Sequence, residues 1–139
     1  MTERELHDRL KSQCAHLCGA RIYLGDSVVT LEQEGYPALY CYHVNDKAKG
    51  EGTQHGVRQI VTAHYGVYCV ADRERYSVLA DDLAQLRATV RGALVGHRFS
   101  GCLTPMRLVE GYRVKADAQA AIWLDLFAVD DLMIGEANA

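Results

Sequence analysis

The chain lacks the long apolar runs and the cysteine pattern that mark membrane and secreted proteins. No stretch approaches about 18 consecutive apolar residues, so we expect no membrane-spanning segment. Residues 1–7 have neither the basic start nor the apolar core of a signal peptide. The cysteines number five, and an odd number without a secretion signal favours a reducing compartment and free thiols.

Signatures of catalysis and of metal binding are also missing. The sequence has no GxSxG, no HExxH and no Cys–His pairing with a local signature. Cys14 and Cys18 share one helical face while His16 points elsewhere, and no CxxC or HxxxH pair supplies the two further ligands of a zinc site. Asp81 and Asp82 point about 100° apart on a helix and are interpreted as partners of its dipole. We therefore expect no enzyme activity, no cofactor and no metal.

One glycine-bearing string, Lys49-Gly-Glu-Gly-Thr53, superficially resembles a phosphate-binding loop. The GxxxxGK[ST] order is absent, and a strand follows where a phosphate site needs the N-terminus of a helix. The net charge of −3 and the pI near 6.0 give no general attraction to nucleic acid. We expect no direct nucleic-acid specificity.

The composition is that of an ordinary globular protein. Hydrophobic residues make up 49% and charged residues 24% of the chain. A length of 139 residues is enough for one good core and too short for two. The sequence therefore predicts a single domain over residues 1–139.

Two segments have the apolar spacing of amphipathic helices, residues 3–18 and 77–94. Thr2 and Glu5 form a capping box at the start of the first, and Ser77 is placed to cap the second. A glycine follows each of them, in the position that ends a helix.

Strand-like segments fill most of the remaining chain. They are residues 21–24, residues 38–44, a long strand that starts at Val57, residues 106–114 and residues 120–129. The long strand alternates, with Tyr65 on one face and Thr62 and His64 on the other, and Gly66 in its middle predicts a bulge or a bend. Residues 26–35 have no clean period, and we expect a short turn or helix there.

Two polar segments are expected to lie outside the sheet. Residues 45–54 form the one long polar stretch with glycines and are interpreted as a mobile loop. Residues 130–139 are interpreted as a short acidic C-terminal tail.

This order of elements predicts an α+β fold. We expect a mostly antiparallel sheet of about four to five strands, with both helices packed on one face. The other face carries tyrosine, threonine and histidine, and such a half-polar face suits contact with another subunit.

Several strings of residue types resemble the bacteriophage tail terminator proteins. A buried strand, Ala38-Leu-Tyr-Cys-Tyr-His-Val44, is followed by a polar loop, Lys47-Ala-Lys-Gly-Glu-Gly-Thr53, and then by the long strand from Val57. The helix that comes next and a closing hairpin with an aromatic residue, here Trp123, match the family as well. The resemblance covers nearly the whole chain.

The resemblance implies a structural virion protein that forms a ring, usually a hexamer, on the end of the tail tube. Such a ring ends tube polymerisation and provides the surface that joins tail to head. The implied partners are other copies of the chain, the tail tube protein and a head-completion or neck protein. The implied location is the head-proximal end of the virion tail, and the host cytoplasm during assembly. The residues expected at a protein interface are Lys47, Lys49, His55 and Arg58.

Two alternatives fit the same sequence. Another neck or tail-completion protein has this size, and a generic small dimeric α+β binding domain would pair through its half-polar sheet face. Measuring the mass of the oligomer in solution distinguishes a two-fold dimer from a ring.

Overall fold

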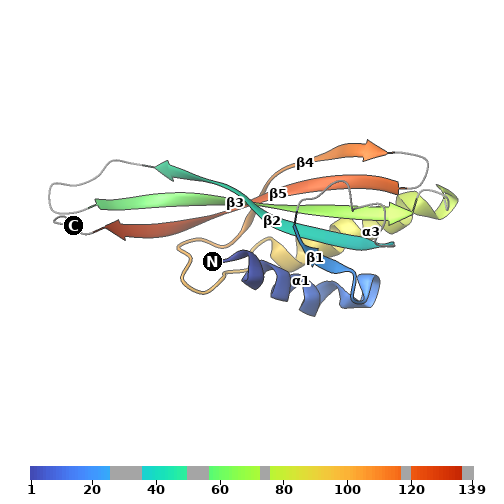
Figure 1. Cartoon of the computed structure of the whole chain (residues 1–139), viewed down its shortest axis with the longest axis horizontal. Helices are drawn as coiled ribbons and strands as arrows, with labels where there is room; N and C mark the ends of the chain where they lie inside the picture. Colours follow the sequence, from blue (N-terminus) through green and yellow to red (C-terminus); the bar gives the residue numbers. More distant parts are fainter. Residues whose placement is uncertain (26–35, 50–56, 73–75, 117–119, 136–139) are drawn as a thin grey trace.

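The computed structural model describes residues 1–25, 36–49, 57–72, 76–116 and 120–135. These residues form two helices and one sheet (Figure 1), which confirms the predicted α+β class. The elements are, in chain order, α1 (Glu3–Cys18), β1 (Ile22–Leu24), β2 (Ala38–Lys49), β3 (Val57–Asp72), α3 (Tyr76–Leu94), β4 (Arg107–Ala116) and β5 (Ala120–Gly135).

The strands form a five-stranded sheet in the order β1-β2-β3-β5-β4. β1 runs parallel to β2, and the other neighbours are antiparallel. The register aligns one row of residues across the whole sheet, Tyr23, Tyr40, Tyr68, Leu124 and Tyr112. This row belongs to the face that was expected to be rich in tyrosine.

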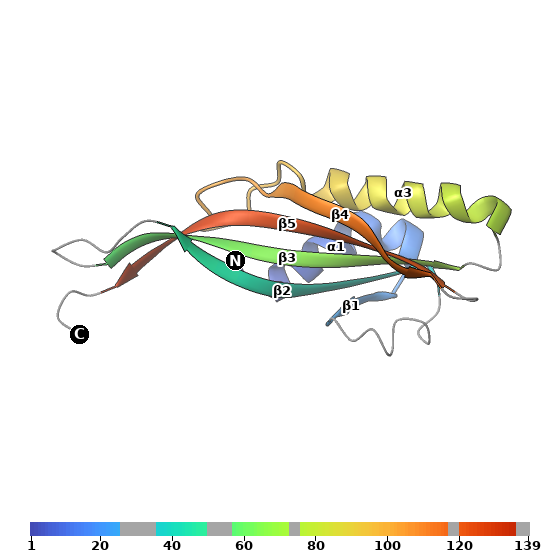
Figure 2. The ribbon, with the colours of Figure 1, turned by 90° about the horizontal axis from the view of Figure 1, so that it is seen from above.

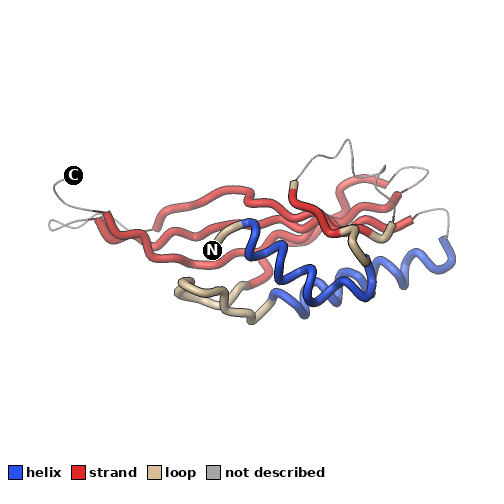
Figure 3. The backbone as a smooth tube through the Cα atoms, turned by 60° about the horizontal axis from the view of Figure 1, so that its bottom comes forward, coloured by secondary structure: helices blue, strands red, loops and turns tan. Residues whose placement is uncertain are grey.

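Both helices pack on the other face of the sheet (Figures 2 and 3). Apolar residues spaced three and four apart put one stripe of each helix against the strands. The core so formed includes Leu6, Leu10, Cys14 and Cys18 of α1, Leu86, Val90 and Leu94 of α3, and Val67, Cys69 and Phe127 of the sheet. His16 is exposed, as the helical spacing predicted.

The helix ends agree with the capping residues in the sequence, with one exception. The Thr2 hydroxyl accepts a hydrogen bond of 3.2 Å from the Glu5 amide. Gly19 and Gly96, at φ 57° and 85°, follow α1 and α3 in backbone conformations that glycine adopts without strain. α3 begins at Tyr76, so Ser77 lies inside the first turn and is not the residue that precedes the helix.

The sequence predicted a bulge or a bend at Gly66, and the continuous register of β3 shows that there is no bulge at this residue. Gly66 stays in register with Tyr42, and a Cβ at Gly66 would lie 2.7 Å from Cε1 of the Tyr42 ring. That ring crosses over the glycine and stacks on Tyr68, with centroids 5.6 Å apart. The irregularity lies in β2 instead, between His43 and Asn45.

β2 and β5 are longer than the sequence predicted. β2 continues through Lys49, so residues 45–49 are strand and not loop. β5 continues through Gly135, so residues 130–135 are strand and not tail. Both extensions pair with β3 through backbone hydrogen bonds, which polar side chains do not prevent. Residues 50–54 of the predicted loop and residues 136–139 of the predicted tail lie outside the described residues. The short turn or helix predicted for residues 26–35 lies outside them as well.

A carboxylate is buried between α3 and the sheet. Asp125 is fully buried and accepts hydrogen bonds from Arg91 Nε at 2.9 Å, from Arg91 Nη2 at 2.8 Å and from Trp123 Nε1 at 2.9 Å. The Arg87 guanidinium lies 3.5 Å from the centroid of the Trp123 ring. Because a buried charge is tolerated only when it is paired and hydrogen-bonded, these contacts fix α3 over β5.

Candidate interaction surface

The sheet extends past the helices as a narrow arm (Figure 1). The arm consists of residues 45–49 of β2, 57–64 of β3 and 128–135 of β5, and neither helix runs along it. β1 pairs with β2 as far as Cys41, and β4 pairs with β5 from Ala128 inward. In the described part of the chain, no strand therefore pairs with the outer side of β2 beyond Cys41 or with that of β5 beyond Ala128. At Asp130 the loop between α3 and β4 takes this place on β5: the Leu103 amide donates to the Asp130 carbonyl, and the Asp130 amide donates to the Thr104 hydroxyl, both at 2.9 Å.

Three of the four predicted interface residues lie on this arm. Lys47 is exposed and is in register with Thr62, Lys49 is the last residue of β2, and Arg58 is the second residue of β3. His55 lies outside the described residues. The fold thus gathers three of the positions at one end of the molecule, and their role in an interface stays a prediction.

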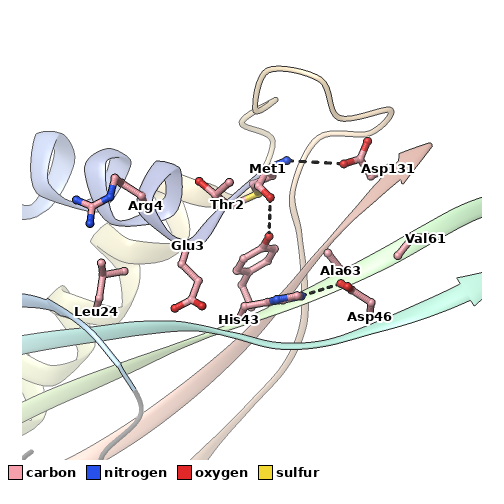
Figure 4. A pocket seen from close by; sticks show the side chains of 11 residues that line it. Met1, Thr2, Glu3, Arg4, Leu24, His43, Asp46, Val61, Ala63 and Asp131 are labelled. Atoms are coloured by element: carbon pink, nitrogen blue, oxygen red, sulfur yellow. Dashed lines mark hydrogen bonds and ion pairs between the residues drawn. The ribbon is translucent and has the colours of Figure 1, made fainter. Parts of the chain in front are cut away.

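A cleft of about 850 Å³ lies at the base of the arm, between the start of α1 and strands β2, β3 and β5 (Figure 4). Its wall includes the apolar side chains of Leu24, Val61 and Ala63. Its charged and titratable groups are Glu3, Arg4, His43, Asp46, Tyr65, Asp131 and the Met1 ammonium. The cleft is therefore a polar, concave surface built from segments that are far apart in the sequence.

The β2 irregularity places His43 and Asp46 on the same side of the strand. In a regular strand, residues three apart point to opposite faces, and one extra residue reverses that relation. The His43 Nε2 atom lies 2.7 Å from Asp46 Oδ1, and the His43 ring stacks on Tyr65 with centroids 4.9 Å apart. The bulge therefore creates one wall of the cleft.

The first residues of the chain form the opposite wall. The Tyr65 hydroxyl donates a hydrogen bond of 3.2 Å to the Met1 carbonyl, and the Met1 ammonium lies 3.7 Å from Asp131 Oδ2. Figure 4 shows the Glu3 side chain extending from α1 toward β2. These contacts hold the start of α1 against β3 and β5 and keep the cleft in shape.

The two faces of the sheet at the base of the arm carry opposite charge. Tyr65 and His64 are consecutive in β3 and so point to opposite faces. On the cleft side, burial and the nearby Asp46 carboxylate raise the pKa of Tyr65 to about 12. On the other side, burial and the positive charges of Lys47 and Arg107 lower the pKa of His64. The cleft side, with Glu3, Asp46 and Asp131 against Arg4 and the Met1 ammonium, has a small acidic excess, and the opposite side, with Lys47 and Arg107 against Asp130, a small basic excess.

The sequence did not predict the acidic residues of the cleft. Asp46 falls in the segment interpreted as a loop, and Asp131 in the segment interpreted as a tail. One signal was present: residues 132–134, Leu-Met-Ile, are apolar and favour a strand that continues past Asp131.

The described residues offer this surface for binding and reveal no metal site. No group of three His, Cys, Asp or Glu side chains among them is placed to hold a metal ion. None of the described helices has the length and apolar character needed to cross a membrane.

The family model for the phage tail terminator protein matches residues 3–136 of this chain. This range includes the two described helices and the five strands of the sheet. The chain belongs to the phage tail terminator family. It is accordingly a structural component of a phage tail. Comparison with curated proteins gives no significant sequence match.

A chain from a solved structure titled "Virion of native gene transfer agent (GTA) particle" has a similar fold. The TM-score is 0.61 at 14% sequence identity, and the match covers 92% of this chain and 92% of that chain. At this identity the likeness concerns the fold alone, and it extends over nearly the whole terminator-family chain.

Proposed function

We propose that this protein forms a closed ring that caps the tail tube, ends the addition of tube subunits and provides the surface that joins the tail to the head. The observation that carries the proposal, beside family membership, is the arm, in which the outer edge of β2 and the outer edge of β5 beyond Asp130 have no neighbouring strand among the described residues. Of all parts of the described molecule, the arm is the one that extends beyond the helix-covered core.

Two different open edges suit assembly from head to tail. A strand at the edge of a sheet presents backbone N–H and C=O groups with which a strand of another chain can pair. The outer sides of β2 and β5 are different surfaces, so a contact between them is heterologous. Heterologous contacts close into a ring when the rotation between neighbours divides a full turn.

The arm also carries features that discourage pairing between free subunits. β-Bulges and lysines on an edge strand are two devices that limit uncontrolled edge-to-edge association. β2 has a bulge between His43 and Asn45 and an exposed lysine at Lys47. Edge pairing is then favoured where other contacts already hold the subunits together, as they do on the end of a tube.

The proposed mechanism requires a ring whose shape matches the end of the tube. It also requires that the ring bind the assembled tube end more tightly than free tube subunits. One side of the ring matches the last ring of the tail tube and covers the surface to which the next tube subunit would bind. The other side presents a different surface, to which a head-completion or neck protein binds. Higher affinity for the assembled tube end than for free tube subunits is sufficient to end elongation.

Two measurements test this function. Size-exclusion chromatography with light scattering should give the mass of a monomer that assembles on the tube or that of a hexamer, whereas the mass of a dimer would support the generic binding domain. In electron micrographs, tail tubes polymerised with this protein present should stop growing and carry an extra ring at one end. Tubes that elongate equally with and without the protein contradict the proposal.

A further inference from the structure

We propose that the acidic cleft of one copy receives the basic face of the arm of the next copy around the ring, with Asp46 facing Lys47 across the contact. The basic face is defined by the side chains of Lys47, His64 and Arg107. This inference rests on the proposed ring and specifies its repeated heterologous contact as one between opposite faces of two arms, in place of pairing between their strand edges.

The first argument is the placement of two opposite charges on one strand. Asp46 and Lys47 are neighbours in β2 and therefore point to opposite faces of the sheet. Asp46 is in register with Ala63, and both line the cleft. Lys47 is in register with Thr62, whose hydroxyl bonds to Asp130 on the face away from the cleft. Each copy thus carries complementary charges on the front and back of the base of its arm.

The second argument is that each side has a small excess of one charge among the side chains that the structure describes. The cleft holds the carboxylates of Glu3, Asp46 and Asp131, against Arg4 and the Met1 ammonium. Asp46 remains half-exposed, at 50%, although it contacts His43. On the basic face, Arg107 lies 3.2 Å from Asp130, which leaves exposed Lys47 as the cation best placed to reach another chain.

The third argument is an apolar side chain beside each charge. Val61, in register with Ala48 of β2, is half-buried and lines the cleft close to Asp46 (Figure 4). Ile60, two residues before Thr62 in β3 and so on the basic face, is 40% exposed. A protein interface needs apolar contact together with a polar rim, and these two residues provide an apolar contact next to the charge pair.

Charge exchange between separate chains tests the contact. We expect Asp46→Lys and Lys47→Glu each to weaken ring assembly by about tenfold or more at low salt, because every interface then meets like charges. Mixed in equal amounts, the two variants should form rings again, because each interface between unlike copies pairs opposite charges. The double variant Asp46→Lys/Lys47→Glu should assemble alone for the same reason.

The controls separate this contact from net charge and from folding. Asp8 and Lys11 are exposed on α1, and Asp8→Lys and Lys11→Glu make the same changes in charge away from the cleft. Both controls should assemble like the wild type. Recovery in the mixture also shows that each variant is folded.

The outcomes distinguish the contact from the ring. Single variants that assemble like the wild type, or a mixture that fails to recover, overturn the contact and leave the ring standing. A mixture that fails to recover would also indicate that the cleft binds a basic segment of the tail tube protein instead of a second copy of this chain. A wild-type protein that stays monomeric both in solution and on tube ends overturns the ring and the contact together.

Discussion

Arg91 donates a hydrogen bond to each carboxylate oxygen of Asp125, across 34 residues of sequence and from helix to sheet. The pair joins α3 to β5 at a point where the carboxylate is fully buried. Hydrogen bonding to Asp125 raises the pKa of Arg91 further above its ordinary value. The charged form of Arg91 is therefore favoured by its hydrogen bonds to Asp125.

Replacing Arg91 with methionine should lower the free energy of unfolding by about 3–5 kcal/mol, because it leaves a buried carboxylate without its cation. The double variant Arg91→Met/Asp125→Leu should recover most of this loss, since apolar residues of similar volume often replace a buried ion pair at little cost. Urea denaturation measures both values. A double variant as unstable as Arg91→Met would show that the ion pair is not what the single change disrupts.

Gly111→Ala is expected to destabilise the protein by about 1–3 kcal/mol through overpacking. A Cβ at Gly111 would lie 2.3 Å from Asp125 Oδ1 and 2.8 Å from Arg91 Nη2, so the ion pair must shift. Gly92→Ala is the matched control, because Gly92 lies inside α3 with nothing within 4 Å of the added atom. The control should be stabilised slightly, by about 0.5–1 kcal/mol. Equal thermal midpoints for the two variants would contradict this account.

The sequence predicted the elements whose pattern arises from a local cause. The capping box at Thr2 and the spacing of Leu6, Leu10 and Cys14 predicted α1, because one helical face must meet the core. The alternation around Tyr65 predicted β3 and the side chains of each face, because β3 lies in the middle of the sheet. The larger core lies on its helix side, and a smaller buried cluster that includes Tyr68 and Val70 lies on its other side.

The sequence did not predict the arm, because the strands of the arm do not pack one face against a hydrophobic core. Residues 45–49 are polar and exposed where the structure describes their side chains, so no apolar alternation marks them as strand. Backbone pairing with β3 is what keeps them extended. The sequence did not predict the cleft for a second reason. Glu3, Asp46 and Asp131 come together only when the sheet has formed. The bulge that orients Asp46 also has no recognisable sequence pattern.

The five thiols should be nearly unreactive in the folded protein. All five cysteines are buried, and burial raises the pKa of Cys14 to about 11 and that of Cys18 and Cys41 to about 12. At pH 8 a thiol with a pKa near 11 is about one-thousandth thiolate, and the thiolate is the reacting form. Titration with a thiol-specific chromogenic reagent should count no fast-reacting thiol in buffer and five in denaturant. A fast-reacting thiol in buffer would contradict the packing beneath α1.

Stability should fall steeply in alkaline solution, and Tyr65 should account for part of the fall. Its pKa, raised by burial and nearby carboxylates, is about 12 when folded against an ordinary 10. The folded state thus favours the neutral phenol, a stabilisation that is complete below pH 10 and lost as the pH rises to 12. Tyr65→Phe should show a shallower loss of unfolding free energy over that range. Tyr112→Phe, at a tyrosine that is 42% exposed, is the control and should follow the wild type.

The last prediction concerns the lysines of the arm, which the sequence already marked as interface residues. Lys47 is exposed and Lys49 ends β2, so Lys47→Glu/Lys49→Glu should leave the thermal midpoint within a few degrees of the wild type. Tail completion should nevertheless fail, because the arm would meet acidic groups of its partner with the wrong sign. Any affinity that remains for a partner should respond to salt differently from that of the wild type.

Complementation of a phage that lacks this protein measures that outcome. Electron microscopy of the lysate should show overlong tails that are not joined to heads when the double variant is supplied, and normal virions when Lys11→Glu is supplied instead. Lys11 is an exposed lysine of α1, so Lys11→Glu controls for the reversal of one positive charge away from the arm, which is half of the change in the double variant. Normal-length tails joined to heads in the presence of the folded double variant would show that the arm lysines only keep an edge strand soluble. Failure confined to the double variant would place the arm, and not the surface of the helices, at the contact that ends the tube.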